Sequence, residues 1–222
     1  LHKLEKEGLK IYPQPAVIEI IQHKGKQKDF FVENQLPTSP HKRFKNKSEL
    51  LTFHNSNSIE FPFVWKSAQF GYDGTGVKIV RTENDLQNLA DTDCIIEELI
   101  PFKNELAVIV ARNSDGEIKT YPVVEMEFHP EANQVEYVIC PARIDDSVAN
   151  KAREIALNVA KSFQFVGLLA VEMFQTNDDK ILINEVAPRT HNSGHYSIEA
   201  SYTNQFEQHL RTVLNLPLGN TD

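Results

Sequence analysis

Short apolar runs rich in β-branched residues occupy much of the chain after residue 93, and they constrain its fold more than any other feature. CIIEELI, ELAVIVAR, EIKTYPVVEM and QVEYVIC follow one another, and VGLLAVEMF and KILINEV come later. Runs of this length and composition are typical of strands. Between the two groups, DDSVANKAREIALNVAKSF has helical spacing behind an aspartate cap. The apolar positions of this helix are Val148, Ala152, Ile155, Ala156, Val159, Ala160 and Phe163. The second half therefore predicts a sheet with one long helix lying on it.

Shorter helical and strand patterns alternate in the first part of the chain. VIEIIQHKGKQKDFFVEN favours one or two short helices, SELLTFHN a further one, and TENDLQNLADT a helix with a threonine cap. Strands are expected at FPFVWK and VKIVR, a turn and a short strand in QLPTSPHKRFKN, and a last helix near NQFEQHLRTVL. The pattern predicts an α+β fold, with a small lobe over residues 25–92 and a larger lobe over residues 93–222. Residues 1–24, which lack an initiator methionine, are expected to be a linker from a preceding domain.

Composition excludes several classes of protein. None of the apolar runs in the 222 residues reaches eighteen, which argues against a membrane protein. The formal net charge of -8 argues against a nucleic-acid partner. Cys94 and Cys140 lie in strand-like stretches, and we expect buried free thiols, a reducing compartment and a cytoplasmic location.

Three glycines in FGYDGTGVK stand between two strand patterns. Glycine lets backbone amides approach a ligand closely and adopts positive φ, as a loop over phosphate oxygens requires. Neither the P-loop spacing nor a dinucleotide-binding fingerprint is present, and glycine content alone is equally consistent with a flexible hairpin turn. Lys66, at the end of the preceding strand, favours the phosphate interpretation, although a lysine at a strand end is usually a solvated residue.

Two glutamates interrupt the last two strand patterns. If VGLLAVEMF and KILINEV form a hairpin with its turn centred between Asp178 and Asp179, Glu172 and Glu185 lie directly opposite each other. Facing carboxylates favour a bound cation, and their hard oxygens suit magnesium, which commonly also takes substrate phosphates. Asn184 adds another oxygen. The alternative is a register shifted by one residue, or a solvated acidic face.

A polar loop, APRTHNSGHYS, follows directly after Glu185. Arg189 offers a bidentate fork for an anionic substrate, and the histidines, asparagine and serine offer adaptable hydrogen bonds. His191 or His195 could act as a general base, but a loop histidine more often has a structural role.

FGYDGTG, EELIPFKNELAVIVAR and NEVAPRTHNSGH together resemble the ATPase subunit of phosphoribosylaminoimidazole carboxylase, also called 5-(carboxyamino)imidazole ribonucleotide synthetase. The resemblance covers the central portion of that family. It implies an ATP-grasp fold, with the nucleotide between two lobes. It also implies that the protein is a ligase of purine biosynthesis in which Mg²⁺-ATP and bicarbonate carboxylate aminoimidazole ribonucleotide through carboxyphosphate. ATP and Mg²⁺ are the implied cofactors, and a homodimer is the implied assembly.

The resemblance also implies site residues. Lys24 and Lys66 would contact ATP phosphates, Glu105 the ribose, and Glu172 and Glu185 the magnesium. The implied nucleotide site further comprises Gly71, Tyr72, Asp73, Gly74, Thr75, Gly76, Glu97, Glu98, Leu99, Ile100, His129 and Asn184. The implied imidazole-nucleotide site comprises Tyr72, Asp73, Arg189, His191, Asn192 and Ser193. Lys66 and Arg189 are the implied catalytic residues.

Two other functions remain open at this point. The chain could be another ATP-grasp enzyme that activates a carboxylate as an acyl phosphate, or a non-catalytic nucleotide-binding module. The resemblance to a central portion, without the flanking domains of the family, favours the second of these. Retention of the core lysines and carboxylates argues against it.

Overall fold

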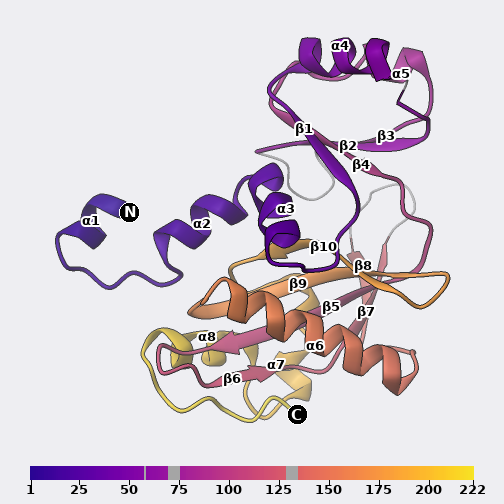
Figure 1. Ribbon diagram of the computed structural model, residues 1–222. Helices are drawn as coiled ribbons and strands as arrows, with labels where there is room; N and C mark the ends of the chain where they lie inside the picture. The colour runs from indigo at the N-terminus through magenta and orange to yellow at the C-terminus, as the bar shows by residue number, and fades with distance from the viewer. Residues whose placement is uncertain (58, 70–75, 129–134) are drawn as a thin grey trace.

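Two antiparallel sheets, each covered by helices, make up the protein (Figure 1). The structure is a computed structural model that describes residues 1–57, 59–69, 76–128 and 135–222. The smaller sheet has the order β1-β4-β2-β3, and the larger has the order β10-β9-β5-β7-β8, with β6 also paired to β5. In Figure 1 the smaller sheet lies above the larger one, and residues 99–101 connect β4 to β5. The fold class is α+β, as the sequence predicts.

The helices and strands have the following bounds. The helices are α1 (His2–Lys6), α2 (Pro15–Ile21), α3 (Lys24–Glu33), α4 (Lys47–Asn57), α5 (Glu83–Gln87), α6 (Asp146–Ser162), α7 (Ser197–Ala200) and α8 (Gln205–Val213), with a 3-10 turn, η1 (Asn192–Gly194). The strands are β1 (His41–Phe44), β2 (Phe63–Ser67), β3 (Val77–Val80), β4 (Cys94–Glu98), β5 (Phe102–Arg112), β6 (Ile118–Thr120), β7 (Val124–Phe128), β8 (Val135–Ile139), β9 (Gly167–Thr176) and β10 (Ile181–Ala187).

The smaller sheet has a hydrophobic core of its own. Phe44, Phe63 and Trp65 from the strands pack with Leu50 of α4 and Leu86 of α5. The expected threonine cap is confirmed: the Thr82 side chain accepts a hydrogen bond from the Asp85 amide, and the Asp85 side chain accepts one from the Thr82 amide. This core fixes β2 and β4 side by side, so that the side chains of Lys66 and Glu97 can meet.

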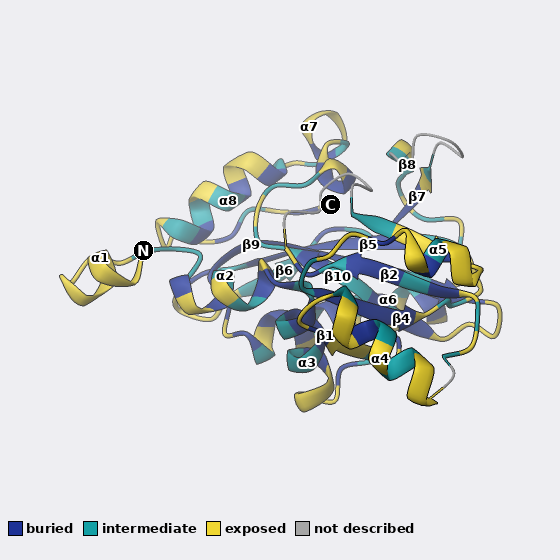
Figure 2. Ribbon diagram, turned by 90° about the horizontal axis from the view of Figure 1, so that it is seen from above, coloured by how far each residue is buried: buried dark blue, intermediate teal, exposed yellow. Residues whose placement is uncertain are grey.

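The larger sheet is covered on both faces, and most residues of its strands β5 and β9 are buried (Figure 2). The long helix α6 lies on one face, and all seven apolar positions expected to bury there are buried. Asp145 occupies the expected cap position, but its side chain makes no capping hydrogen bond. On the other face, Ile109, Leu168 and Ala170 pack with Tyr121 and Leu218. Successive side chains along β5 and β9 thus point alternately into two hydrophobic cores, as expected for strands buried on both sides.

One expected strand is two strands in the structure. EIKTYPVVEM divides into β6 and β7, and the break falls at Tyr121 and Pro122. Proline has no amide to donate to a strand ladder, which explains the interruption. Tyr121 remains buried, and its hydroxyl donates a 2.7 Å hydrogen bond to the Thr203 carbonyl.

Sheet membership crosses the lobe boundary expected at residue 92. Strand β4 begins at Cys94, yet it pairs with β1 and β2 in the smaller sheet. Helix α3 lies before that boundary, yet its Phe31 packs in the core beneath α6. The division into residues 1–24, 25–92 and 93–222 therefore stays a prediction about domains, while the two sheets divide near residue 100.

Both cysteines are free thiols, as expected. Cys94 is buried, whereas Cys140 is only partly so. Among the described residues, no helix is long and apolar enough to cross a membrane.

Candidate functional site

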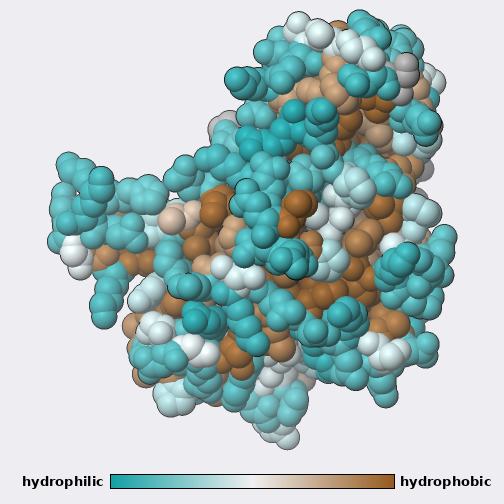
Figure 3. All heavy atoms as spheres, viewed as in Figure 1, coloured by the Kyte–Doolittle hydropathy of each residue, from teal (hydrophilic) through white to brown (hydrophobic). Residues whose placement is uncertain are grey.

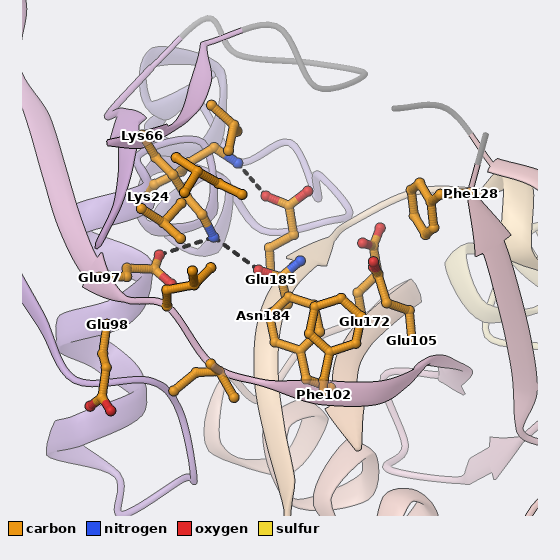
Figure 4. Close-up of a pocket in the computed structure, with 16 residues that line it drawn as sticks. Lys24, Lys66, Glu97, Glu98, Phe102, Glu105, Phe128, Glu172, Asn184 and Glu185 are labelled. Atoms are coloured by element: carbon orange, nitrogen blue, oxygen red, sulfur yellow. Dashed lines mark hydrogen bonds and ion pairs between the residues drawn. The ribbon is translucent and has the colours of Figure 1, made fainter. Parts of the chain in front are cut away.

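A cleft of about 270 Å³ lies between the two sheets (Figure 4). On the face shown in Figure 3, polar and apolar residues are interspersed on both lobes, and apolar ones are also visible in the region between them. The cleft brings together residues of both lobes that the sequence singled out: Lys24, Lys66, Glu97, Glu98, Leu99, Ile100, Glu105, Glu172, Asn184 and Glu185. Residues up to 161 positions apart in the sequence thus share one site.

The β9–β10 hairpin places Glu172 opposite Glu185, as the sequence predicts. The assumed turn position was wrong, however, because next to the turn Ile183 pairs with Met173 and Leu182 with Phe174. A register shift between Ile183 and Glu185 adds one residue, Asn184, and restores the glutamate pairing. Bulges redirect side chains at functional sites. Here the bulge carries Asn184 into the cleft beside Glu185.

Lys24 is the first residue of α3, and its ammonium forms an ion pair with Glu185 (Figure 4). Its amide donates to the carbonyl of Ala68, which joins the helix start to the end of β2. The preceding His23 accepts a hydrogen bond from the Lys26 amide and lies 3.2 Å from Asp93. These contacts fix the helix start, and with it the position of the Lys24 charge at the cleft.

Lys66 is 8% exposed, in contrast to the solvated strand-end lysine that the sequence alternative describes. Its Nζ donates to Asn184 Oδ1 at 2.9 Å and lies 3.1 Å from Glu97 Oε1 (Figure 4). Lys66 lies within β2. Because successive side chains of a strand point to opposite faces, the Lys66 side chain points into the space between the two sheets. Lys66 therefore contributes a largely desolvated charge at the cleft.

The acidic side of the cleft holds Glu105, Glu172 and Glu185. Burial, and after it the nearby Glu172, raise the pKa of Glu105 to about 7. Burial also raises the pKa of Glu185, but Lys24 and Lys66 outweigh it and hold that pKa below its ordinary value. The pKa values of these two carboxyls are thus shifted in opposite directions. Glu105 is therefore suited to exchange a proton or donate a hydrogen bond near neutral pH.

Apolar side chains form the remaining walls of the cleft. Phe102 and Phe174 stack with their ring centroids 4.6 Å apart. Phe128, Val64, Val77 and Ile79 complete these walls. Next to them, residues 97–100 leave β4 and cross toward β5, so backbone groups are available at the cleft edge. The sequence does not reveal these walls, because apolar residues in strands give the same signal whether they line a core or a ligand site.

The polar loop after β10 lies beside the cleft rather than in its lining. His191 Nε2 is 3.0 Å from Glu172 Oε1, and His191 Nδ1 lies 2.9 Å from Ser193 Oγ. Arg189 is exposed and donates to the Thr190 carbonyl, and Asn192 is exposed as well. His191 therefore connects the loop to the carboxylate pair. The structural role that loop histidines often have fits this contact.

Several predicted site residues lie outside the described residues: Gly71, Tyr72, Asp73, Gly74, Thr75 and His129. Gly76, the last residue of the glycine loop, is described and has a φ of 83°. This left-handed conformation favours glycine. Its carbonyl accepts a hydrogen bond from the Ser67 amide, so the loop starts and ends at neighbouring points of β2 and β3.

The donor set of the cleft fits a hard divalent cation. Glu172 and Glu185 face each other across the strand pair, and the Asn184 side chain lies in the same cleft. Among the described residues, no group of three His, Cys, Asp or Glu side chains could hold a metal alone. Magnesium usually binds one or two carboxylates and completes its shell with water and substrate phosphates. Two carboxylates therefore suit a magnesium ion that arrives with a phosphate ligand.

Glu97 should make the stability of this region pH-dependent. Burial raises its pKa, but Lys66 and Lys28 outweigh burial and lower the pKa from 4.5 to about 2. Its contribution, about 3 kcal/mol at about 1.4 kcal/mol per pKa unit, is present above pH 4.5 and is lost as the pH falls toward 2. Urea unfolding should show Glu97→Gln to be less stable than wild type at pH 7, with the difference shrinking below pH 4.5. A difference independent of pH would contradict this assignment.

Comparison with known proteins agrees with this geometry. Residues 29–206 match the family model described as the ATP-grasp domain. The chain belongs to the ATP-grasp family. The family-level resemblance drawn from the glycine, EELIPF and APRTHNSGH segments is thereby confirmed, and so is the expected fold.

Comparison with individual proteins of the ATP-grasp family identifies more specific similarities. The chain is 42% identical over 214 residues to a phosphoribosylaminoimidazole carboxylase of Candida glabrata, covering 95% of this chain and 37% of that protein. The crystal structure of N5-carboxyaminoimidazole ribonucleotide synthetase from Thermotoga maritima superposes with a TM-score of 0.86 at 44% identity, over 99% of this chain and 56% of that one. The Aspergillus clavatus synthase, solved with ADP and 5-aminoimidazole ribonucleotide, gives a TM-score of 0.87 at 33% identity, over 99% and 59%. The chain thus spans less than two thirds of the length of these relatives.

Proposed function

We propose that the cleft binds Mg²⁺-ATP, and that the protein to which this ATP-grasp unit belongs carboxylates aminoimidazole ribonucleotide with bicarbonate. The observation that carries the proposal is the meeting of Lys24 and Lys66 with Glu172 and Glu185 in one apolar-walled cleft. Relatives with this fold are named N5-carboxyaminoimidazole ribonucleotide synthetases, and one was solved with ADP and the imidazole nucleotide. ADP, phosphate and 5-(carboxyamino)imidazole ribonucleotide are the proposed products.

The groups that line the cleft have distinct parts in this proposal. Lys24 and Lys66 bind phosphate oxygens, the backbone of residues 97–100 faces the purine, and Glu105 accepts hydrogen bonds from the ribose when ionised. The apolar walls exclude water and so strengthen the electrostatic contacts. Glu172, Glu185 and Asn184 hold magnesium, which, when bound, neutralises charge on the phosphates during transfer.

The proposed reaction has two bond-forming steps. A bicarbonate oxygen attacks the γ-phosphorus of ATP, and the bond to ADP breaks. The exocyclic amine of the imidazole nucleotide then attacks the carboxyl carbon of carboxyphosphate, or carbon dioxide released from it; phosphate leaves, and the amine gives up one proton, which the released phosphate can accept. Arg189, His191, Asn192 and Ser193, with Tyr72 and Asp73 of the glycine loop, are the proposed contacts to the imidazole nucleotide. A cytoplasmic homodimer belongs to the same proposal.

The test is phosphate release from Mg²⁺-ATP in bicarbonate buffer, with and without aminoimidazole ribonucleotide. We expect the ribonucleotide to stimulate release, and we expect Glu185→Gln to abolish the stimulated part. Release that responds to an amino acid or biotin instead would identify another ATP-grasp ligase. Nucleotide binding without release by the 222-residue chain would identify a nucleotide-binding module.

A further inference from the structure

Lys28 is a buried cation that has no part in the proposed reaction. It lies one turn after Lys24 in α3 and is only 2% exposed. Its Nζ donates to Thr38 Oγ1 at 2.7 Å, to Ser39 Oγ at 3.1 Å and to the Ile183 carbonyl at 3.2 Å. Burying an ammonium is unfavourable unless it is paired and hydrogen-bonded. Such a group calls for a functional or structural reason.

The charged partner of Lys28 is Glu97, which is 4% exposed. Glu97 Oε2 accepts a 2.7 Å hydrogen bond from Ser39 and lies 3.3 Å from Lys28 Nζ. The other oxygen, Oε1, accepts no hydrogen bond among the described residues, and Lys66 Nζ lies 3.1 Å from it. The buried carboxylate of Glu97 is therefore shared between two lysines: Lys66, which lines the cleft, and Lys28, which does not.

This sharing decides how much charge Lys66 can offer a ligand. If Glu97 had Lys66 as its only cationic partner, the two would form a closed neutral pair in a desolvated place. Lys28 supplies the second positive charge, so the three groups carry a net charge of +1. Because Lys28 lies outside the cleft lining and Lys66 within it, that surplus faces the cleft.

We propose that Lys28 is a positioning residue. It neutralises Glu97 from the side away from the cleft and thereby leaves the Lys66 ammonium free to bind an anionic phosphate. The proposal rests on the proposed nucleotide function of the cleft. Lys28 also contacts the smaller sheet through Glu97 and the larger sheet through Ile183, so it holds the two walls of the cleft in register. The KGKQK spacing places Lys24 and Lys28 on one helix face, but it does not indicate that Lys28 is buried against Glu97.

The first test measures Mg²⁺-ATP affinity by calorimetry for wild type, Lys28→Met and a matched control, Lys26→Met. Lys26 lies in the same helix, but its side chain is 42% exposed and pairs with Glu19, so its loss should leave affinity unchanged. Lys28→Met should weaken binding on the order of tenfold to a hundredfold, as for residues that orient metal ligands. Affinity equal to wild type in a folded Lys28→Met would overturn the proposal.

The double variant Lys28→Met/Glu97→Gln separates charge from packing. Removing the carboxylate as well leaves Lys66 without an anionic partner, so affinity should recover to within a few-fold of wild type. Equally weak binding in the folded double variant would show that Lys28 acts only through packing, and would overturn the proposal. If Lys28→Met alone does not fold, the pH profile of the wild-type chain still tests the proposal.

A pH profile of wild type needs no variant. Burial lowers the pKa of Lys28 to about 8, against the opposing effect of Glu97. The charged groups that face Lys28 are Glu97 from β4, Lys66 from β2 and Glu185 from β10, with Lys24 on its own helix. We expect ATP affinity to fall as the pH rises through 8 in wild type, and folded Lys28→Met to lack that step. The same profile in both would count against the proposal. Absence of ATP binding by wild type at any pH would instead defeat the nucleotide function.

Discussion

Glu185→Gln should weaken Mg²⁺-dependent ATP binding by about a hundredfold, with little change in binding measured without magnesium. Glu185 faces Glu172 across the β9–β10 pair, and its carboxylate already pairs with Lys24. Glutamine keeps the shape of the side chain but removes the charge that the cation requires. Lys24 would lose its partner too, which should slightly favour metal-free nucleotide. Calorimetric titrations with and without magnesium measure both effects.

A matched control for this substitution is Glu136→Gln. Glu136 lies in β8 of the same sheet and is exposed. Its substitution should leave the magnesium dependence as in wild type. If Glu185→Gln kept the full magnesium effect, the carboxylate pair would not be the metal site, and the ion pair with Lys24 would be its main role.

Lys66→Met should weaken ATP binding whether or not magnesium is present. A hydrogen bond from a charged donor contributes about 2 kcal/mol, which corresponds to about thirtyfold in affinity. The chain should still fold, because Glu97 keeps Lys28 and Ser39 as partners and methionine fills the lysine stem volume. Calorimetry gives the affinity, and a thermal melt shows whether the fold is kept.

Lys78→Met is the control for Lys66. Lys78 lies in β3, where it pairs with Trp65 of the neighbouring strand β2, but the Lys78 side chain is exposed. Its loss removes the same charge without touching the cleft, so binding should be nearly unchanged. A collapsed melting transition in Lys66→Met, without a loss of affinity in the folded fraction, would show that Lys66 has a structural role instead.

The sequence predicted most elements of this fold because their patterns are local. The α6 stripe from Val148 to Phe163 repeats at helical spacing, and the Thr82 cap is a four-residue signal. The break at Tyr121 and Pro122 was missed because the apolar run continues through it. The hairpin shows a different limit. The Glu172–Glu185 pairing was right although the turn was placed wrongly, because the extra residue at Asn184 compensated. A bulge has no reliable sequence signal when the bulged residue is not glycine.

The candidate site, like the fold, has features that could be predicted from the sequence and features that could not. Residue type and spacing singled out Lys66 and the two glutamates, and these come together in the cleft with Lys24, which the family resemblance implied. Burial depends on packing between distant segments, so the sequence did not indicate that Lys66 lies under 10% exposed or that Glu97 has two cationic neighbours. Lys28 escaped notice for this reason. Its three hydrogen-bond acceptors and its ion-pair partner come from three separate parts of the chain.

The most direct test of the account is a crystal structure of the 222-residue chain with a non-hydrolysable ATP analogue and magnesium. We expect the purine beside residues 97–100 and the aromatic wall, phosphate oxygens within hydrogen-bond distance of Lys24 and Lys66, and the metal on Glu172 and Glu185. Nucleotide bound outside the cleft, or bound inside it with both lysines still turned to Glu185 and Glu97 and away from the phosphates, would contradict it.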